Sequence, residues 1–178
     1  ITIQQIAKTV EELNAAVLNL NSSKVLMDVD AQEEIQRIVN EADRLLQIGR
    51  DVVIASSGSR DFLALTIQRG RELGMNEVEV MRKVASALGE SANRILEHAR
   101  ISGLILTGGE TAIEALRIMG AVGVNVIDEV LPGIPLGEVV GGKHNRLRVI
   151  TKAGAFGGQD AISESIRYLR RIICQEMC

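Results

Sequence analysis

Apolar positions along the chain are spaced in two different ways. In some segments they recur every three or four residues, which places them on one face of an α-helix. This spacing predicts helices over residues 3–20, 31–48, 62–73, 78–100, 110–119 and 162–173. Between these segments lie short continuous apolar runs, which are typical of buried strands. The predicted strands cover residues 25–27, 51–55, 103–107, 124–127, 139–140 and 147–150.

Turn and capping residues mark the boundaries of these elements. Asp30 with Glu33 three residues later has the spacing of a capping box and predicts a helix start. The segment 131–137 contains both prolines and is interpreted as a structured loop. The glycines and polar residues of 141–145 predict the turn of an antiparallel hairpin between the last two strands.

Alternating strands and helices imply βαβ crossovers. The predicted fold is therefore α/β, with a mainly parallel sheet, helices on both faces and a Rossmann-like three-layer sandwich. A length of 178 residues fits one domain over 1–178. Aromatic residues make up 2% of the chain and hydrophobic residues 46%, so the core must be aliphatic, which suits this class better than a β-sandwich.

Composition also excludes several partners. The net charge is −3 and basic residues do not cluster, so we expect no nucleic-acid partner. No apolar run is long enough to span a membrane, and the first residues lack a signal-peptide pattern, so a cytoplasmic location is expected. Cys174 and Cys178 are interpreted as reduced thiols rather than metal ligands, since other ligands are scarce nearby, and no metal site is predicted.

The candidate chemistry lies where predicted strands end, because ligands of open α/β sheets bind beyond the carboxyl ends of the strands. Thr107, Gly108, Gly109, Glu110 and Thr111 lead from a strand into a helix. Two glycines allow close backbone approach, and the helix start offers free amides to an anion such as phosphate. Glu110 would repel phosphate unless Mg²⁺ lay between them. The alternative is an ordinary tight turn with an acidic first helical residue.

Two further strand ends are rich in small residues. Lys152, followed by Gly154 and Gly157, can neutralise a phosphate that the backbone surrounds; the alternative is a flexible surface turn. Ser56 and Ser57 can supply hydroxyl donors, or Ser56-Ser57-Gly58-Ser59 can equally cap the next helix. The spacing matches neither a Walker P-loop nor G-x-G-x-x-G.

Taken together, three motifs resemble the four-carbon acid sugar kinase family, and specifically its C-terminal, nucleotide-binding domain. The motifs are GLILTGGETA (103–112), EVLPGIPLG (129–137) and VITKAGAFG (149–157), in the order and spacing of that family. The opening TIQQI (2–6) resembles the first helix of the same domain. The family often has Lys-Ser-Gly where this chain has Lys152-Ala153-Gly154, so one hydroxyl is lost here.

The resemblance implies an ATP-dependent kinase that phosphorylates threonate, erythronate or 3-oxo-tetronate type acids. It implies ATP contacts from residues 108–111 and Gly154, with a serine of 56–57 as a looser match, and Mg²⁺ bound with the ATP. Lys152 and the amides of Gly108 and Gly109 would then hold phosphate oxygens. The family's sugar-acid pocket belongs largely to an N-terminal domain absent from this sequence, so we assign no catalytic residue.

Two alternatives to a kinase domain stay open from the sequence. One is a non-catalytic module that binds a nucleotide or phosphate ester and acts through partners. The other is a purely structural or oligomerising domain. Homodimerisation is also expected.

Overall fold

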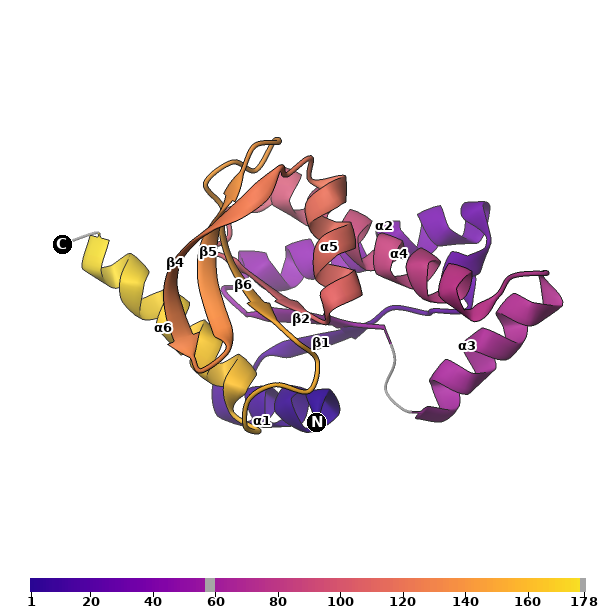
Figure 1. Ribbon diagram of the computed structural model, residues 1–178, viewed down its shortest axis with the longest axis horizontal. Helices are drawn as coiled ribbons and strands as arrows, with labels where there is room; N and C mark the ends of the chain where they lie inside the picture. The colour runs from indigo at the N-terminus through magenta and orange to yellow at the C-terminus, as the bar shows by residue number, and fades with distance from the viewer. Residues whose placement is uncertain (57–59, 177–178) are drawn as a thin grey trace.

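The computed structural model describes residues 1–56 and 60–176. Helices and strands alternate along most of this length (Figure 1). The helices are α1 (Thr2–Leu13), α2 (Asp28–Gln47), α3 (Arg60–Glu72), α4 (Glu77–His98), α5 (Gly109–Ile118) and α6 (Ala161–Glu176), with a short 3-10 helix η1 (Lys24–Leu26). The strands are β1 (Ala16–Asn19), β2 (Val52–Ala55), β3 (Leu104–Thr107), β4 (Gly123–Leu131), β5 (Ile134–Val140) and β6 (Arg148–Lys152).

The strands form two sheets enclosed between helices, so the α/β, Rossmann-like prediction is confirmed. β1 and β2 pair in parallel, and the second sheet has the order β3-β6-β5-β4. In that sheet β3–β6 is parallel, whereas β6–β5 and β5–β4 are antiparallel. The β5–β6 hairpin was predicted. The β4–β5 pairing was not, because its turn lies in the segment interpreted as a loop.

Helices cover the sheets on two sides and give three layers. α2 packs on β1 and β2, α5 packs on β3, and α4 packs against both helices. α1 and α6 pack against each other on the opposite side, where α6 contacts β3 and β4 (Figure 1). The core is aliphatic, as expected: Ile38, Ile134 and Ile150 are fully buried. Between β2 and β3 lies a cavity of about 630 Å³, which separates the two sheets.

Two boundaries near the start of the chain were predicted wrongly. The helix expected over 3–20 ends at Leu13, because Asn14 adopts a left-handed conformation with φ 53°. Val17, expected on that helix face, lies in β1 instead. The strand expected at 25–27 is replaced by η1. Short apolar runs do not distinguish a strand from a helical turn, which explains the misplacement.

Two local motifs also differ from the expectations. α2 begins at Asp28 after Met27, without a side-chain cap, so Asp30 lies inside the helix. The segment 131–137 is a β-hairpin rather than a loop. Leu131 pairs with Ile134 across a two-residue Pro132-Gly133 turn, and Gly133 has φ 76°. Proline followed by a glycine with positive φ is the combination that a type II turn favours, and this turn joins β4 to β5.

Candidate functional site

The carboxyl ends of the parallel strands carry the residues singled out from the sequence. The last pairs of the two parallel registers are Asn19 with Ala55 and Thr107 with Lys152. Ser56 follows β2, and the cavity between β2 and β3 is lined by Ser56, Thr107 and Thr111. The structure therefore brings these three predicted residues to one cavity. Ser57 lies outside the described residues.

The strand–glycine–helix turn has the local structure predicted for it. Gly108 has φ 96°, a conformation that side chains with a Cβ rarely adopt, and it precedes the first residue of α5. The amide of Ala112 donates to the carbonyl of Gly108 as the first helical hydrogen bond. The amides of Gly109, Glu110 and Thr111 therefore have no partner within the helix, as at every helix start.

Gly109 leaves open space beside this turn. A Cβ built on Gly109 would meet no atom within 4 Å. Glu110 is exposed on the first turn of α5. The amide of Gly108 donates to the carbonyl of Lys152 at 2.9 Å, which ties the turn to the end of β6. The turn and the glycine-rich loop are thus direct neighbours.

The side chain of Lys152 is turned inward. It is 3% exposed, and its Nζ donates to the carbonyls of Ala153 (3.0 Å), Gly154 (3.0 Å) and Phe156 (3.2 Å). Burial lowers the pKa of Lys152 below its ordinary value, because the charged form loses water. To contact a phosphate directly, as the sequence suggested, the ammonium would have to leave these carbonyls.

Two residues of α1 hold the same loop, and sequence reasoning missed both. Gln5 is fully buried, and its Nε2 donates to the carbonyls of Phe156 (3.0 Å), Gly157 (3.4 Å) and Gly158 (2.8 Å). The hydroxyl of Thr2 donates to the carbonyl of Gly154 at 2.9 Å. Their polar side chains at i and i+3 on the buried side of a helix were the signal that could have found them.

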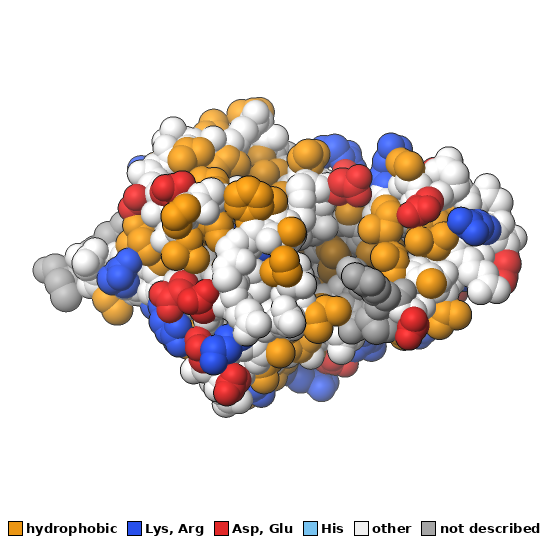
Figure 2. Space-filling view, turned by 60° about the horizontal axis from the view of Figure 1, so that its bottom comes forward, with side chains coloured by type: hydrophobic (Ala, Val, Ile, Leu, Met, Phe, Trp, Pro, Cys, Tyr) orange, Lys and Arg blue, Asp and Glu red, His pale blue; other side chains and the backbone are white. Residues whose placement is uncertain are grey.

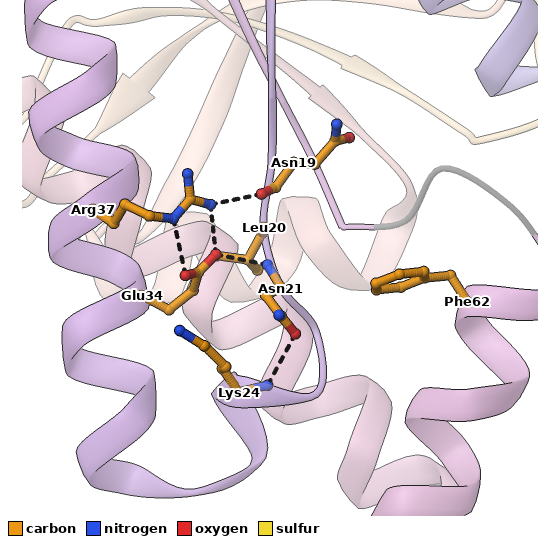
Figure 3. Close-up of a pocket in the computed structure, with 7 residues that line it drawn as sticks. All are labelled: Asn19, Leu20, Asn21, Lys24, Glu34, Arg37 and Phe62. Carbon is orange, nitrogen blue, oxygen red and sulfur yellow. Dashed lines mark hydrogen bonds and ion pairs between the residues drawn. The ribbon is translucent and has the colours of Figure 1, made fainter.

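A second polar cluster lies at the ends of β1 and β2. A pocket of about 430 Å³ is lined there by Asn19, Leu20, Asn21, Lys24, Glu34, Arg37 and Phe62 (Figure 3). Glu34 is 2% exposed and receives two hydrogen bonds from Arg37, at 2.6 and 3.0 Å, and one from the amide of Asn21 at 2.7 Å. Burial acts to raise the pKa of Glu34, but these hydrogen bonds outweigh it and hold the pKa below its ordinary value.

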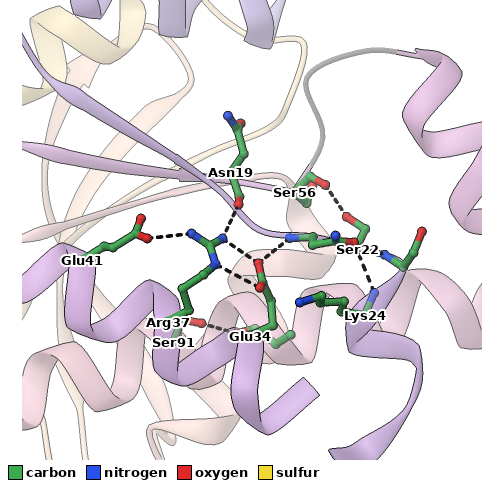
Figure 4. A network of polar contacts seen from close by, with 11 residues as sticks. Asn19, Ser22, Lys24, Glu34, Arg37, Glu41, Ser56 and Ser91 are labelled. Carbon is green, nitrogen blue, oxygen red and sulfur yellow. Dashed lines mark hydrogen bonds and ion pairs between the residues drawn. The ribbon is translucent and has the colours of Figure 1, made fainter. Parts of the chain in front are cut away.

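This cluster continues across the strands. Arg37 also donates to the carbonyl of Asn19 at 2.8 Å and to Glu41 at 3.0 Å, while Ser22 donates to the carbonyl of Ser56 (Figure 4). The contacts fasten α2 and the segment after β1 to the end of β2. Nothing in the motifs pointed to Asn19, Asn21 or Arg37. The only available signal was an acid and a base three residues apart on α2.

Charged side chains are unevenly distributed over the lower side of the molecule. Figure 2 brings the lower side of Figure 1 forward, and the middle of this face is occupied mainly by backbone and uncharged side chains. Charged side chains gather mostly around it. A ligand at the middle of this face would therefore meet uncharged groups more than charged side chains.

Among the described residues, no group of three or more His, Cys, Asp or Glu side chains is arranged to hold a metal ion. Cys174 is an exposed free thiol, and Cys178 lies outside the described residues. Over residues 1–56 and 60–176, no helix combines the length and the apolar character needed to cross a membrane.

Parallel strands that end in a glycine turn, a helix start with free amides and a glycine-rich loop are features shared by phosphate-binding α/β domains. Comparison with known proteins identifies the family. Residues 1–162 match the family described as the nucleotide-binding C-terminal domain, and the chain belongs to that family.

Its relatives include kinases of four-carbon sugar acids. The chain is 31% identical to the D-threonate kinase of Salmonella typhimurium over 160 residues, which is 90% of this chain and 38% of the relative. It is 33% identical to the D-erythronate kinase of Heliobacterium modesticaldum over 104 residues, 57% of this chain and 24% of the relative. The chain thus spans less than half the length of these relatives.

The fold has solved counterparts. A Bordetella bronchiseptica protein, crystallised with citrate as a domain-swapped dimer, superimposes with a TM-score of 0.72 at 26% identity. The similarity covers 95% of this chain and 38% of that protein. The predicted resemblance to the nucleotide-binding domain of four-carbon acid sugar kinases is therefore confirmed at the level of the family.

Proposed function

We propose that residues 1–178 form the ATP-binding domain of a kinase that phosphorylates a four-carbon sugar acid of the threonate or erythronate type. The observation that carries this proposal is the junction of two backbone segments. The Gly108 amide bonds to the Lys152 carbonyl, and so the free amides of the α5 start lie next to the loop that follows β6. Membership of the nucleotide-binding family and the kinase relatives support the same assignment.

In this proposal the ATP phosphates lie between the two segments. The amides of Gly109, Glu110 and Thr111 face the phosphate oxygens with the positive end of the α5 dipole behind them. Thr107, Thr111 and Ser56 line the adjoining cavity and offer hydroxyl donors. Gly154 and Gly157 contribute loop backbone, and Ser57 is kept as a further candidate donor from the sequence.

Phosphoryl transfer depends on positioning and charge neutralisation more than on covalent chemistry by the protein. When bound, Mg²⁺ would neutralise charge on the phosphates, and Glu110, the acidic residue in the first turn of α5, would orient it through water. The γ-phosphoryl group would pass from ATP to a substrate hydroxyl, ADP would leave, and the hydroxyl proton would go to a base outside this domain. The sugar acid would bind an N-terminal domain of the complete enzyme.

We also propose that the complete enzyme is a cytoplasmic homodimer. The kinase relatives act on small metabolites, and a structurally similar protein crystallised as a domain-swapped dimer; both observations support this expectation.

The test is calorimetric titration of the chain with Mg-ATP and Mg-ADP. We expect dissociation constants between micromolar and millimolar. Gly109→Asp places a carboxylate in the open space beside the helix start and should abolish the binding heat. Gly123→Asp is the matched control, because that exposed glycine also has open space around it and lies at the start of β4. The absence of heat with the unchanged protein would contradict the proposal.

A further inference from the structure

The loop that follows β6 is held by its carbonyl groups. Lys152, Gln5 and Thr2 together bind the carbonyls of Ala153, Gly154, Phe156, Gly157 and Gly158. Lys152 and Gln5 are both buried, whereas residues 155–160 are exposed. The carbonyls therefore point toward the protein interior along almost the whole loop.

Because peptide groups are planar and trans, the direction of each carbonyl fixes the direction of the amide that follows it. The C=O and N–H of one peptide unit point in opposite directions. Inward carbonyls at residues 153, 154, 156 and 157 therefore direct the amides of Gly154, Ala155, Gly157 and Gly158 outward. Within the described part of the chain none of these four amides donates to another group, whereas the amide of Phe156 closes a turn onto the carbonyl of Ala153 at 3.0 Å.

The chain bears an energetic cost to keep this arrangement. Among the described residues the buried Lys152 ammonium contacts carbonyls and no acidic side chain, so carbonyl dipoles replace its water. The Oε1 atom of Gln5 is buried with no hydrogen-bond partner among the described residues. A buried polar atom left unpaired calls for an explanation, and holding three loop carbonyls with the other end of the amide supplies one.

We propose that Lys152 and Gln5 are positioning residues for phosphate binding, with Thr2 as a weaker third. They hold the loop carbonyls inward, so that the amides of Gly154, Ala155, Gly157 and Gly158 form a concave group of donors for an anion beside the start of α5. Lys152 acts through the backbone and does not touch the phosphate. This inference rests on the proposed function and assigns roles within the same site.

The first experiment measures the accessibility of Lys152. The folded protein is treated with a small amine-acetylating reagent, with and without Mg-ATP, and each lysine is followed by mass spectrometry. We expect Lys152 to react at least about tenfold more slowly than the exposed Lys24 in both states, because its Nζ is buried on carbonyls. Rapid acetylation that ATP suppresses would mean direct contact with phosphate and would overturn the proposal, as would rapid acetylation in both states.

The second experiment separates positioning from simple loss of structure. Gln5→Met keeps the side-chain volume and removes the donors, and Gln4→Met is the matched control on the exposed side of α1. We expect Gln5→Met to weaken ATP binding about tenfold, because the loop loses its hydrogen bonds to this side chain. The affinity for adenosine, measured by competition, should stay the same. Gln4→Met should change neither value.

The outcomes of this titration distinguish failure of the proposed function from failure of the positioning role. If the unchanged protein binds no ATP, the proposed function fails and this inference fails with it. If it binds ATP and folded Gln5→Met binds ATP equally well, the positioning role alone is overturned. An equal loss of ATP and adenosine binding would also overturn it, since a general structural defect would weaken both. If Gln5→Met does not fold, Thr2→Val decides, with an expected two- to threefold loss of ATP affinity from about one hydrogen bond.

Discussion

The carboxyl ends of the parallel strands form two halves, β1 with β2 and β3 with β6, and the two halves use different polar groups. At the ends of β1 and β2, charged side chains satisfy one another, with buried Glu34 bound by Arg37 and by the Asn21 amide. At the ends of β3 and β6, Lys152 and Gln5 bind carbonyls, and several amides of the glycine segments have no partner among the described residues. In the first half the donors bind other groups of the protein, whereas in the second half several amides are available to a ligand.

This difference shows why a polar pocket is not by itself a ligand site. The pocket beside Arg37 contains the more obvious charges, but Glu34 and Arg37 are already paired with each other, and Arg37 also with Glu41. The glycine segments, residues 107–111 and 152–158, expose no cationic side chain, yet they present backbone donors that a phosphate can use. The comparison predicts that changes in the Glu34–Arg37 cluster alter stability and that changes in the glycine segments alter nucleotide binding.

The largest effect is expected from Gly157→Ala. Gly157 has φ 79°, and a Cβ there would lie 2.6 Å from the Cβ of Ala161. Strain and overpacking together should destabilise the protein by about 1–3 kcal/mol and weaken ATP binding, measured by urea denaturation and calorimetry. Gly158→Ala is the control, because its Cβ would meet only the movable carboxylate of Asp160. Equal stability of the two variants would contradict this packing argument.

A smaller effect is expected from Glu34→Gln. Folding lowers the pKa of Glu34, so its stabilising contribution is complete above the unfolded pKa of about 4.3 and is lost as the pH falls through the folded pKa. The variant should lose about 1–2 kcal/mol at neutral pH, from its charged hydrogen bonds, and should show a shallower loss of stability below about pH 4. Denaturation curves across this pH range, with ATP titrations alongside, test both halves of the comparison. A changed ATP affinity would mean that the two halves are not independent.

The smallest effect is expected from Lys24→Ala. Lys24 is exposed beside the pocket of Glu34 and Arg37. Its removal should change stability by less than about 0.5 kcal/mol and leave ATP affinity unchanged. A clear loss of ATP affinity in calorimetry would place the pocket of Glu34 and Arg37 within the nucleotide site.

Local signals were enough to predict the turn at Gly108. The apolar run of β3, the two glycines and the helical spacing after them all lie within 103–119, and the structure has that strand, turn and helix. The β5–β6 hairpin was predictable for the same reason. By contrast, β1 was missed because Leu13 and Val17 keep helical spacing across Asn14, and spacing alone does not reveal a left-handed residue.

The inward orientation of Lys152 could not be predicted from nearby residues. A lysine before a glycine-rich segment suggests an exposed cation, and its burial depends on packing with the rest of the fold. Gln5 contributes as many contacts to the loop as Lys152 but lies 151 residues from Phe156. The sequence motifs therefore located the candidate site, but not the residues that orient it.

That sequence separation has a kinetic consequence. Contacts between α1 and residues 154–158 close one of the longest loops in the chain, and such contacts form slowly because a large loss of chain entropy precedes them. The sheets and α2 to α5 can form from nearer contacts. We therefore expect the loop to become ordered late in refolding, so that recovery of ATP binding lags behind recovery of helical circular dichroism.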